Sequence, residues 1–421
     1  MPERIPYPLP TPGPLRELAA YLHEGILSAR DAANLLDQGF SWNLLAPYVQ
    51  DRDWWLAQHP AAGRPLAQPW QMKAWGATLE LKAPDETIWI DPGPRAPMPS
   101  RPPDLIVVTH AHHDHTASLG ELSDAFPETP VAMSHQTATL LALRAPLDRL
   151  LQACLAQRVV CLALGKERTL GGVRVTLRSA GHLLGATMAE LRLAEDAILI
   201  TGDLALRDVG GVPRAEWPQA EYNLVVMESA TAGCGSLPVA DAETNRRPFL
   251  NQVAELVEQG RTRLLVSVQA MGQAQELYAA LVMAQRAGAF PKSTIRLTGM
   301  AARVSDEYYR ALSYLPGPWS CPFEMASDSV PDGSVVIMGA TNSEVTKESD
   351  HLRDQGQSSG SGVIHNAIVY THGGWSEHMA LATGIACHEV ALYHGYSASL
   401  EMTLVEMGRK VTALSSEAIE W

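Results

Sequence analysis

Cysteine is scarce in this sequence. The 421 residues include only five cysteines, Cys154, Cys161, Cys234, Cys321 and Cys387. Their number is odd, they are widely scattered and no CxxC pair occurs, so neither a disulfide scaffold nor a cysteine zinc site is expected. We expect them to be reduced thiols in a cytoplasmic protein.

Long apolar runs and an excess of positive charge are also missing. No uninterrupted apolar run approaches the ~20 residues of a membrane span, and the N-terminus MPERIPYPLPTPGP has no apolar signal core. The sequence therefore predicts a soluble protein with no membrane segment. The formal net charge of -14 argues against a generally basic surface that coats nucleic acid, although it leaves room for a local basic groove.

Short apolar runs, in contrast, recur along most of the chain. They are DLIVVT, DAILIT, YNLVVM, TRLLVSV, GSVVIM, NAIVYT and EVALYH, and most of them end in a polar residue. Helix-like segments such as QAQELYAALVMAQRAG lie between some of the runs, which indicates an α/β fold with functional groups at strand ends. The preceding segment QMKAWGATLELKAPDETIWIDPGP alternates as a β-hairpin does. The length predicts two domains or one domain with a large insertion.

The N-terminal region is expected to be a helical extension. Apolar residues recur at helical spacing from Leu15 to Ile26, and the Pro- and Ala-rich stretch QHPAAGRPLAQP follows. The region also carries Trp42, Trp54 and Trp55. These tryptophans either pack on the core or dock a protein partner.

The most unusual segment is THAHHDHTASLG, which follows the run DLIVVT. Each buried neutral imidazole needs a hydrogen-bond partner or a metal. The HxHxDH pattern of His110, His112, Asp114 and His115 offers the nitrogen and oxygen ligands that zinc accepts. In a loop leaving a strand, the first two imidazoles can converge on one metal while the next two groups turn toward a second. His113 occupies the variable position and is left out; the alternative is a polar loop with histidines by chance.

Three further polar residues are candidates for the site because each lies next to a glycine or shortly after an apolar run. His182 lies in RSAGHLLGATMAEL, Asp203 in AILITGDLAL and His394 in EVALYHGY. A carboxylate at Asp203 could bridge two cations. Each residue also has an ordinary interpretation, as a structural histidine, a turn cap and a core histidine respectively.

Together, the segments THAHHDH, SAGHLLGATMAEL, TGDL and YHG resemble the motifs of the metallo-β-lactamase superfamily. Three more resemble its β-CASP nuclease branch: VVMESATAG, with Glu228 at the acidic motif A, LLVSVQAMGQAQELYAAL at an inserted strand and helix, and YTHGGW, with His372 at motif B. The signature arginine of the inserted helix is Gln273 here. The interval from His372 to His394 also matches the branch, and the resemblance runs from about Met72 to the C-terminus.

The resemblance implies an α/β fold, namely a metallo-β-lactamase αββα sandwich with an inserted β-CASP α/β domain. We expect the helical extension at 1–67, the first part of the sandwich at 68–237, the insertion at 238–345 and the second part of the sandwich at 346–421.

The resemblance also implies two metal sites and a pair of catalytic side chains. The implied ligands are His110, His112 and His182 for one ion, Asp114, His115 and His394 for the other, and Asp203 as a bridge, with Asp114 and Asp203 also counted as catalytic. Two zinc ions are expected, with manganese as the alternative. Glu228 would orient His372, which would contact the scissile phosphate or protonate the leaving oxygen. The alternative for this pair is an ordinary structural ion pair.

These expectations predict a two-metal phosphodiesterase, a nuclease that hydrolyses RNA or single-stranded DNA in an endo- or exonuclease mode. His394 at the motif C position resembles the RNA-processing members. A DNA exonuclease of DNA repair, a thioesterase- or lactonase-type hydrolase and a partner-dependent subunit of a nuclease complex are the alternatives, and a homo-oligomer is left open. The candidates for a basic groove, which could equally form surface ion pairs, are Arg246, Arg247, Arg303 and Arg310.

Overall fold

The computed structural model describes residues 64–230, 250–253, 255–256, 263–288, 294–325, 334–338, 361–364, 371–395 and 398–421. The predicted helical extension, with its three tryptophans, lies outside these ranges except for its last four residues. Those four residues include three that form hydrogen bonds with Asn223 or Asp196. The side-chain amide of Asn223 donates to the carbonyls of Arg64 and Pro65, each at 2.9 Å, and the amide of Ala67 donates to Asp196 at 2.6 Å.

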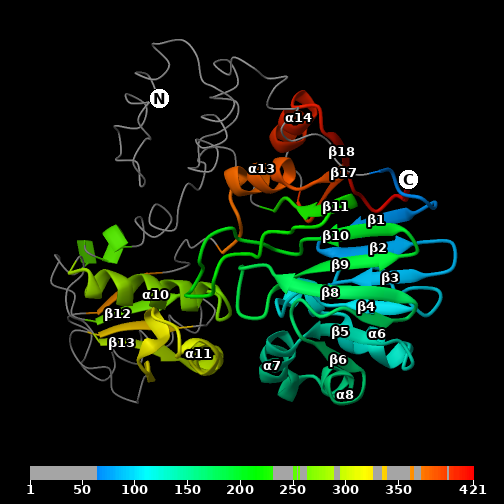
Figure 1. Ribbon diagram of the computed structural model, residues 1–421. Coiled ribbons are helices and arrows are strands. Elements are labelled where there is room, and N and C mark those ends of the chain that lie inside the picture. Colours follow the sequence, from blue (N-terminus) through cyan, green and yellow to red (C-terminus); the bar gives the residue numbers. More distant parts are fainter. Residues whose placement is uncertain are drawn as a thin grey trace, which may run out of the picture.

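Two seven-stranded sheets form the larger part of the fold (Figure 1). The first has the order β19-β1-β2-β3-β4-β5-β6. Its strands are β1 (Gln71–Trp75), β2 (Thr78–Lys82), β3 (Thr87–Ile90), β4 (Leu105–Val107), β5 (Val131–Ser134), β6 (Val159–Leu162) and β19 (Ile419–Glu420). The predicted hairpin is thus the meander β1-β2-β3.

The second sheet has the order β18-β17-β11-β10-β9-β8-β7. Its strands are β7 (Arg168–Leu170), β8 (Val173–Ser179), β9 (Thr187–Leu193), β10 (Asp196–Ile200), β11 (Tyr222–Glu228), β17 (Cys387–Tyr393) and β18 (Lys410–Ala413). Ile88 and Ile90 of the first sheet share a buried cluster with Ile198 and Ile200 of the second. Trp89 belongs to the other cluster, because successive side chains of a strand point to opposite faces.

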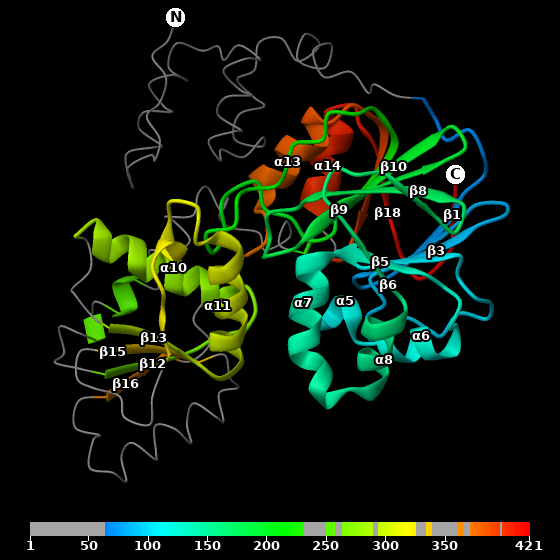
Figure 2. The same cartoon turned by 60° about the horizontal axis from the view of Figure 1, so that its bottom comes forward.

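Helices cover the outer faces of both sheets. Beside the first sheet lie α5 (His113–Thr116), α6 (Leu119–Ala125), α7 (His135–Arg144), the 3-10 turn η2 (Ala145–Leu147) and α8 (Arg149–Gln157). Beside the second lie α13 (Trp375–Gly384) and α14 (Ala398–Glu406). Figure 2 shows the layers, which confirm the predicted αββα sandwich.

A separate α/β body lies beside the sandwich in both views (Figures 1 and 2). Its parallel sheet has the order β14-β13-β15-β12-β16, with strands β12 (Arg263–Ser267), β13 (Thr294–Thr298), β14 (Glu324–Met325), β15 (Ser334–Met338) and β16 (Ser361–Ile364). Its helices are α10 (Gln273–Arg286), α11 (Gly299–Leu312) and the 3-10 turn η3 (Pro318–Ser320). This body occupies the place of the predicted insertion.

The sequence alone gives one prediction of where the insertion ends. It predicts a boundary at residue 345, but β16 pairs in parallel with β12 and so belongs to the inserted sheet. The short sequence SGVI follows a Gly- and Ser-rich stretch and gives no strand signal of its own. We therefore propose that the insertion extends at least to Ile364.

Buried contacts fix the insertion against two loops of the sandwich. Trp319 is buried and stacks on Tyr278 at a centroid distance of 4.7 Å, and its indole nitrogen donates to the carbonyl of Gly210 at 2.6 Å. The hydroxyl of Tyr308 accepts from the amide of Leu184 at 3.0 Å. The insertion is therefore anchored beside the loops that follow β8 and β10.

Among the described residues, every helix is too short or too polar to cross a membrane.

Candidate metal centre

Strands from both sheets end at one edge of the sandwich. β3 and β4 run parallel, as do β10, β11 and β17, so their carboxyl ends bring polar residues together. The residues at or just after these ends are Asp91, Thr109, His110, Asp203, Glu228 and His394. His182 follows β8 after Gly181, whose φ is 73°. A Cβ at Gly181 would lie 2.4 Å from the carbonyl oxygen of Ala205, so only glycine permits this turn.

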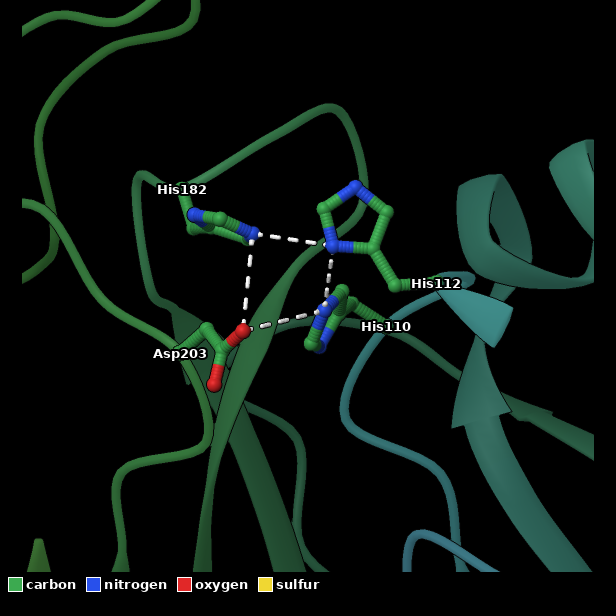
Figure 3. Close-up of side chains that lie close together, drawn as sticks. All are labelled: His110, His112, His182 and Asp203. Carbon is green, nitrogen blue, oxygen red and sulfur yellow. Dashed lines mark hydrogen bonds and ion pairs between the residues drawn. The ribbon is translucent and has the colours of Figure 1, made fainter. Parts of the chain in front are cut away.

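Four side chains form the first cluster, and their inner atoms face a common centre (Figure 3). Nδ1 of His112 lies 3.1 Å from Nε2 of His110 and 3.2 Å from Nε2 of His182. Oδ2 of Asp203 lies 3.5 Å from Nε2 of His110 and 3.7 Å from Nε2 of His182. All four residues are buried.

The outer nitrogens of these imidazoles all have partners that can accept a proton. Nε2 of His112 faces the carbonyl oxygen of Met271 at 3.2 Å, and Nδ1 of His182 faces that of Thr371 at 2.9 Å. Nδ1 of His110 lies 3.0 Å from Oγ1 of Thr109, which donates its own proton to Asp91 at 2.6 Å. Because these partners accept, the outer nitrogens carry the protons and the inner nitrogens present lone pairs.

This arrangement fits a divalent metal ion. Lone pairs of neighbouring nitrogens at 3.1 to 3.2 Å repel each other unless a cation lies between them. Four ligand atoms at the usual zinc distances in a tetrahedron would be about 3.3 Å apart; four of the six distances in the cluster run from 3.1 to 3.7 Å, and all six are within 4.8 Å. The donor set, three imidazoles and one carboxylate, is one that zinc and similar ions accept.

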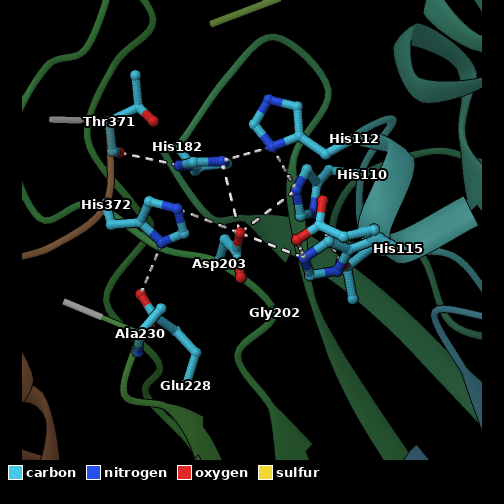
Figure 4. A network of polar contacts seen from close by, with 12 residues as sticks. His110, His112, His115, His182, Gly202, Asp203, Glu228, Ala230, Thr371 and His372 are labelled. Carbon is cyan, nitrogen blue, oxygen red and sulfur yellow. Dashed lines mark hydrogen bonds and ion pairs between the residues drawn. The ribbon is translucent and has the colours of Figure 1, made fainter. Parts of the chain in front are cut away.

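A second cluster adjoins the first and shares Asp203 with it (Figure 4). Nε2 of His115 lies 3.3 Å from Oδ2 of Asp203 and 3.8 Å from Oδ2 of Asp114. His394 reaches Asp114 with Nε2 at 3.5 Å and Asp203 with Nδ1 at 2.9 Å. Nε2 of His115 is buried without a hydrogen-bond partner, as a metal-ligating nitrogen would be once the ion is left out. His113 lies apart, exposed, beside Arg144 at 3.2 Å.

Burial keeps the first cluster in the protonation states that metals bind. It lowers the pKa of His110 and His182 well below the usual histidine value and that of His112 to about 4. For Asp203 burial acts in the opposite direction, but the surrounding imidazoles, His115 first, hold its pKa well below the usual range. Neutral imidazoles around an ionised carboxylate are ready to bind a divalent ion without releasing protons.

Glu228 and His372 meet at the side of the clusters (Figure 4). Nδ1 of His372 lies 3.5 Å from Oε1 of Glu228, and its Nε2 lies 3.6 Å from Oδ2 of Asp203. Burial opposes charge on both groups, yet Asp203 and then Glu228 raise the pKa of His372, while His378 and then His372 lower that of Glu228. The structure thus brings together all nine residues that the sequence predicted for the site.

His378 is a neighbour of Glu228 that the sequence did not reveal. It is fully buried on α13, its Nδ1 lies 2.7 Å from the carbonyl oxygen of Gly374 and its Nε2 lies 3.2 Å from Oε1 of Glu228. Since both partners can only accept, both ring nitrogens are best satisfied when protonated. Against the effect of burial, Glu228 raises the pKa of His378. A histidine inside an apolar helix carries no motif that could have indicated this.

Asp91 was also missed, although the sequence did hold a signal for it. Asp91 is fully buried, and its carboxylate accepts from the amide of Thr109 at 2.7 Å and faces Nδ1 of His115 at 2.9 Å. Through Thr109 it also reaches His110, so one carboxylate orients a histidine of each cluster. The segment IWIDPGP ends an apolar strand on an aspartate beside a turn, as ILITGD does.

Comparisons with known proteins agree with this geometry. Residues 81–239 match the family model described as the metallo-beta-lactamase superfamily. The chain is similar to Integrator complex subunit 11 of Danio rerio, with 25% identity over 193 residues, 41% of this chain and 31% of that protein. It is also similar to Endoribonuclease YSH1 of Mycosarcoma maydis, with 28% identity over 193 residues, 41% of this chain and 22% of that protein. The similarity thus spans less than a third of either relative.

One solved structure resembles most of the chain. It belongs to a protein of unknown function from Enterococcus faecalis V583 and matches with a TM-score of 0.53, covering 84% of this chain and 100% of that one. At 12% sequence identity, this similarity concerns the fold alone.

Proposed function

The chain contains a metallo-β-lactamase domain and resembles the β-CASP nuclease branch, and from this we propose that it is a two-metal phosphodiesterase that hydrolyses RNA or single-stranded DNA. The observation that carries the proposal is the pair of clusters joined at Asp203, in which imidazole nitrogens face carboxylates at 2.9 to 3.8 Å. The relative named an endoribonuclease favours RNA as the substrate.

In this proposal the first cluster would hold one ion and Asp114, His115 and His394 would hold the other, with Asp203 in contact with residues of both groups. Two divalent ions so placed would supply an activated water and would stabilise the charge of the phosphodiester transition state. Zinc is the ion we propose, because nitrogen ligands predominate in the first cluster and equal the oxygen ligands in the second. Asp91 would keep His110 and His115 in the tautomers that present their inner nitrogens.

His372 is the proposed catalytic residue beside the ions. Glu228 faces Nδ1 of His372 at 3.5 Å and favours a proton there, which leaves Nε2 facing the metal ligands, 3.6 Å from Asp203. A proton held on Nε2 can pass to the leaving oxygen or bind a phosphate oxygen. The buried charge of His378 holds Glu228 in its ionised form, so Glu228 stays an acceptor.

The position of the insertion favours a single-stranded substrate over a duplex. It is anchored on Leu184 and Gly210, which lie in the loops that carry His182 and Asp203. We expect a domain held so close to the metal ligands to favour access of a single strand over a duplex. A small-molecule substrate would not need a second domain beside the metals.

The basic residues proposed for binding the phosphate backbone need one revision. Arg310 forms ion pairs with Asp306 at 2.5 Å and Glu307 at 2.9 Å on its own helix, so its charge is already compensated. Arg303 is exposed on the same helix and remains a candidate. Arg246 and Arg247 lie outside the described residues.

The test is hydrolysis of end-labelled oligonucleotides of one sequence, supplied as single-stranded RNA, single-stranded DNA and duplex, at low salt with zinc or manganese. The proposal predicts cleavage of single strands and little cleavage of the duplex, and cleavage of RNA but not DNA would fix the substrate class. Hydrolysis of thioesters or lactones with no cleavage of any oligonucleotide would replace the nuclease by a small-molecule hydrolase. If neither class is hydrolysed with metal bound, the isolated chain is not the enzyme proposed.

A further inference from the structure

The insertion contacts the metal centre itself, and the contact is a single carbonyl group. Oxygen of Met271 lies 3.2 Å from Nε2 of His112, although the two residues are 159 positions apart. Met271 precedes Gly272, the N-cap of α10. A Cβ built on Gly272 would lie 3.6 Å from the same Nε2. The outer partner of His112 therefore comes from the inserted domain, while that of His110 comes from the sandwich.

The loop that carries this carbonyl is held by one buried side chain, that of Gln275 in the first turn of α10. Its Oε1 accepts from the amide of Gly272 at 2.8 Å, and its Nε2 donates to the carbonyl of Ala270 at 3.2 Å. Gln275 thus binds the residues immediately before and after Met271. The peptide group that faces His112 has little freedom to turn while both bonds persist.

The same amide anchors the loop to the next helix. Nε2 of Gln275 also lies 2.9 Å from Oγ of Ser305 and 3.3 Å from the carbonyl oxygen of Ala301, both on α11. The orientation of His112 is thereby connected with the packing of α10 on α11, well inside the insertion.

From these contacts we propose that Gln275 is a positioning residue for the metal centre. It holds the Met271 carbonyl on His112 and so makes the affinity for one metal ion depend on the inserted domain. A neutral imidazole without an outer acceptor rotates more freely and carries its proton on either nitrogen. In the tautomer protonated on Nδ1, His112 has no lone pair to offer at the centre. The proposal rests on the metal site of the proposed function and is independent of the substrate.

The first test compares two variants of α10 in the full chain. Gln275→Met keeps the size of the side chain but removes its donors and its acceptor. Leu281→Ala, the control, removes buried packing from the same helix two turns away without touching the loop. Both zinc dissociation constants are measured by competition with a chromophoric chelator, and circular dichroism establishes that each variant is folded.

We expect Gln275→Met to weaken one of the two zinc sites by about 10- to 100-fold, the usual effect of losing an outer partner of a metal-ligating histidine, and Leu281→Ala to leave both constants within about twofold. Equal constants in Gln275→Met and wild type would overturn the proposal, and so would an equal loss in the two variants, since that would reflect general loosening of the insertion.

A second pair of variants acts on the backbone and does not depend on Gln275 tolerating substitution. Gly272 and Gly288 flank α10 with φ of 87° and 71°, so alanine strains both. At Gly272 the strain falls on the residue next to the Met271 carbonyl, although the added Cβ would itself lie in ordinary van der Waals contact with His112 at 3.6 Å, whereas Gly288 lies at the far end of the helix and a Cβ there meets no atom within 4 Å. We expect Gly272→Ala to weaken zinc binding and Gly288→Ala to leave it unchanged.

Equal zinc affinities in these two glycine variants would contradict the coupling. A wild-type chain that binds no zinc at all would instead contradict the metal site of the proposed function, and the two failures are thus distinguished.

Discussion

The two halves of the metal centre are built differently. His110, His112 and His182 are almost wholly buried, and each has an acceptor behind its outer nitrogen. In the other half, the side chain of Asp114 is 56% exposed and that of His394 is 15% exposed. Both nitrogens of His394 face carboxylates of the centre, so its orientation depends on them. The side chains of the first half are thus held in place by the protein alone, whereas the second half is open to solvent.

The backbone conformation of His394 is a further feature of the second half. Its φ is 50°, in the left-handed region that residues other than glycine enter at some cost in free energy. The following Gly395 approaches the chain so closely that a Cβ there would lie 2.7 Å from Cα of Ala230. Strain of this kind is tolerated where neighbouring structure holds the residue, and it recurs at functional sites.

The strongest perturbation of both halves is expected from Asp203→Asn, because the carboxylate belongs to each cluster. A neutral amide compensates the charge of two cations poorly, so hydrolysis of single-stranded oligonucleotides should fall below detection while the fold persists. The control is Asp208→Asn, an exposed carboxylate five residues further along the chain. Wild-type turnover in Asp203→Asn would rule out a mechanism that uses both ions.

His372→Ala separates catalysis from metal binding. We assign His372 to the phosphate, so turnover should fall by about 10²- to 10⁴-fold, as for other general acid or base groups. Metal content, measured by elemental analysis, should not change. Loss of an ion on this substitution would mean that His372 is a metal ligand, which contradicts its assignment to the phosphate.

Asp91→Asn should affect both halves, because Asp91 orients His115 directly and His110 through Thr109. The amide nitrogen of asparagine accepts neither the Thr109 bond nor the His115 bond that Oδ2 of Asp91 accepts, and we expect about 10- to 100-fold weaker zinc binding at each site. Chelator competition measures it. Gln275→Met is the matched comparison, since it should weaken one site only, and a one-site effect of Asp91→Asn would contradict the shared role.

Removal of metal should occur in two stages. The exposed half should release its ion to a chelator first, because water can reach its carboxylate. Release of the ion from the buried half should require a chelator concentration about tenfold higher or more. His394→Ala should abolish the first stage only. Release of both ions in one step would mean that the two halves do not differ in affinity.

The smallest effect is expected from Arg310→Glu. Because Arg310 is paired with Asp306 and Glu307, the substitution should leave the salt dependence of single-strand binding close to that of the wild type. Arg303→Glu, in contrast, should reduce this salt dependence. Fluorescence anisotropy with labelled single-stranded RNA at two salt concentrations makes the comparison. A loss with Arg310→Glu equal to that with Arg303→Glu would restore Arg310 as a phosphate contact.

Much of this site can be predicted from the sequence because its residues follow strands. His110, Asp203 and His394 each come directly after an apolar run, and parallel strands bring such residues to one edge. Their assignment as metal ligands remains a prediction. Asp91 also follows an apolar strand directly. It lies at the end of a segment whose alternation predicts a β-hairpin, so the sequence did not indicate Asp91 as a site residue.

Other parts of the account depend on tertiary contacts and leave no trace in a local pattern. His378 reaches Glu228 across two elements, and the carbonyl of Met271 reaches His112 from another domain. Backbone groups carry no sequence signal at all. The pairing of β16 with β12, on which the proposed extension of the insertion to Ile364 rests, is likewise a tertiary contact that the short segment SGVI does not indicate.

The central claim, that two unequal sites hold two ions with nitrogen and oxygen ligands, is tested most directly by the metal in the purified wild-type chain. Elemental analysis should find about two divalent ions per chain, and X-ray absorption should show nitrogen and oxygen neighbours at zinc-like distances with no sulfur. No retained metal after loading, or a sulfur ligand in the shell, would contradict the account.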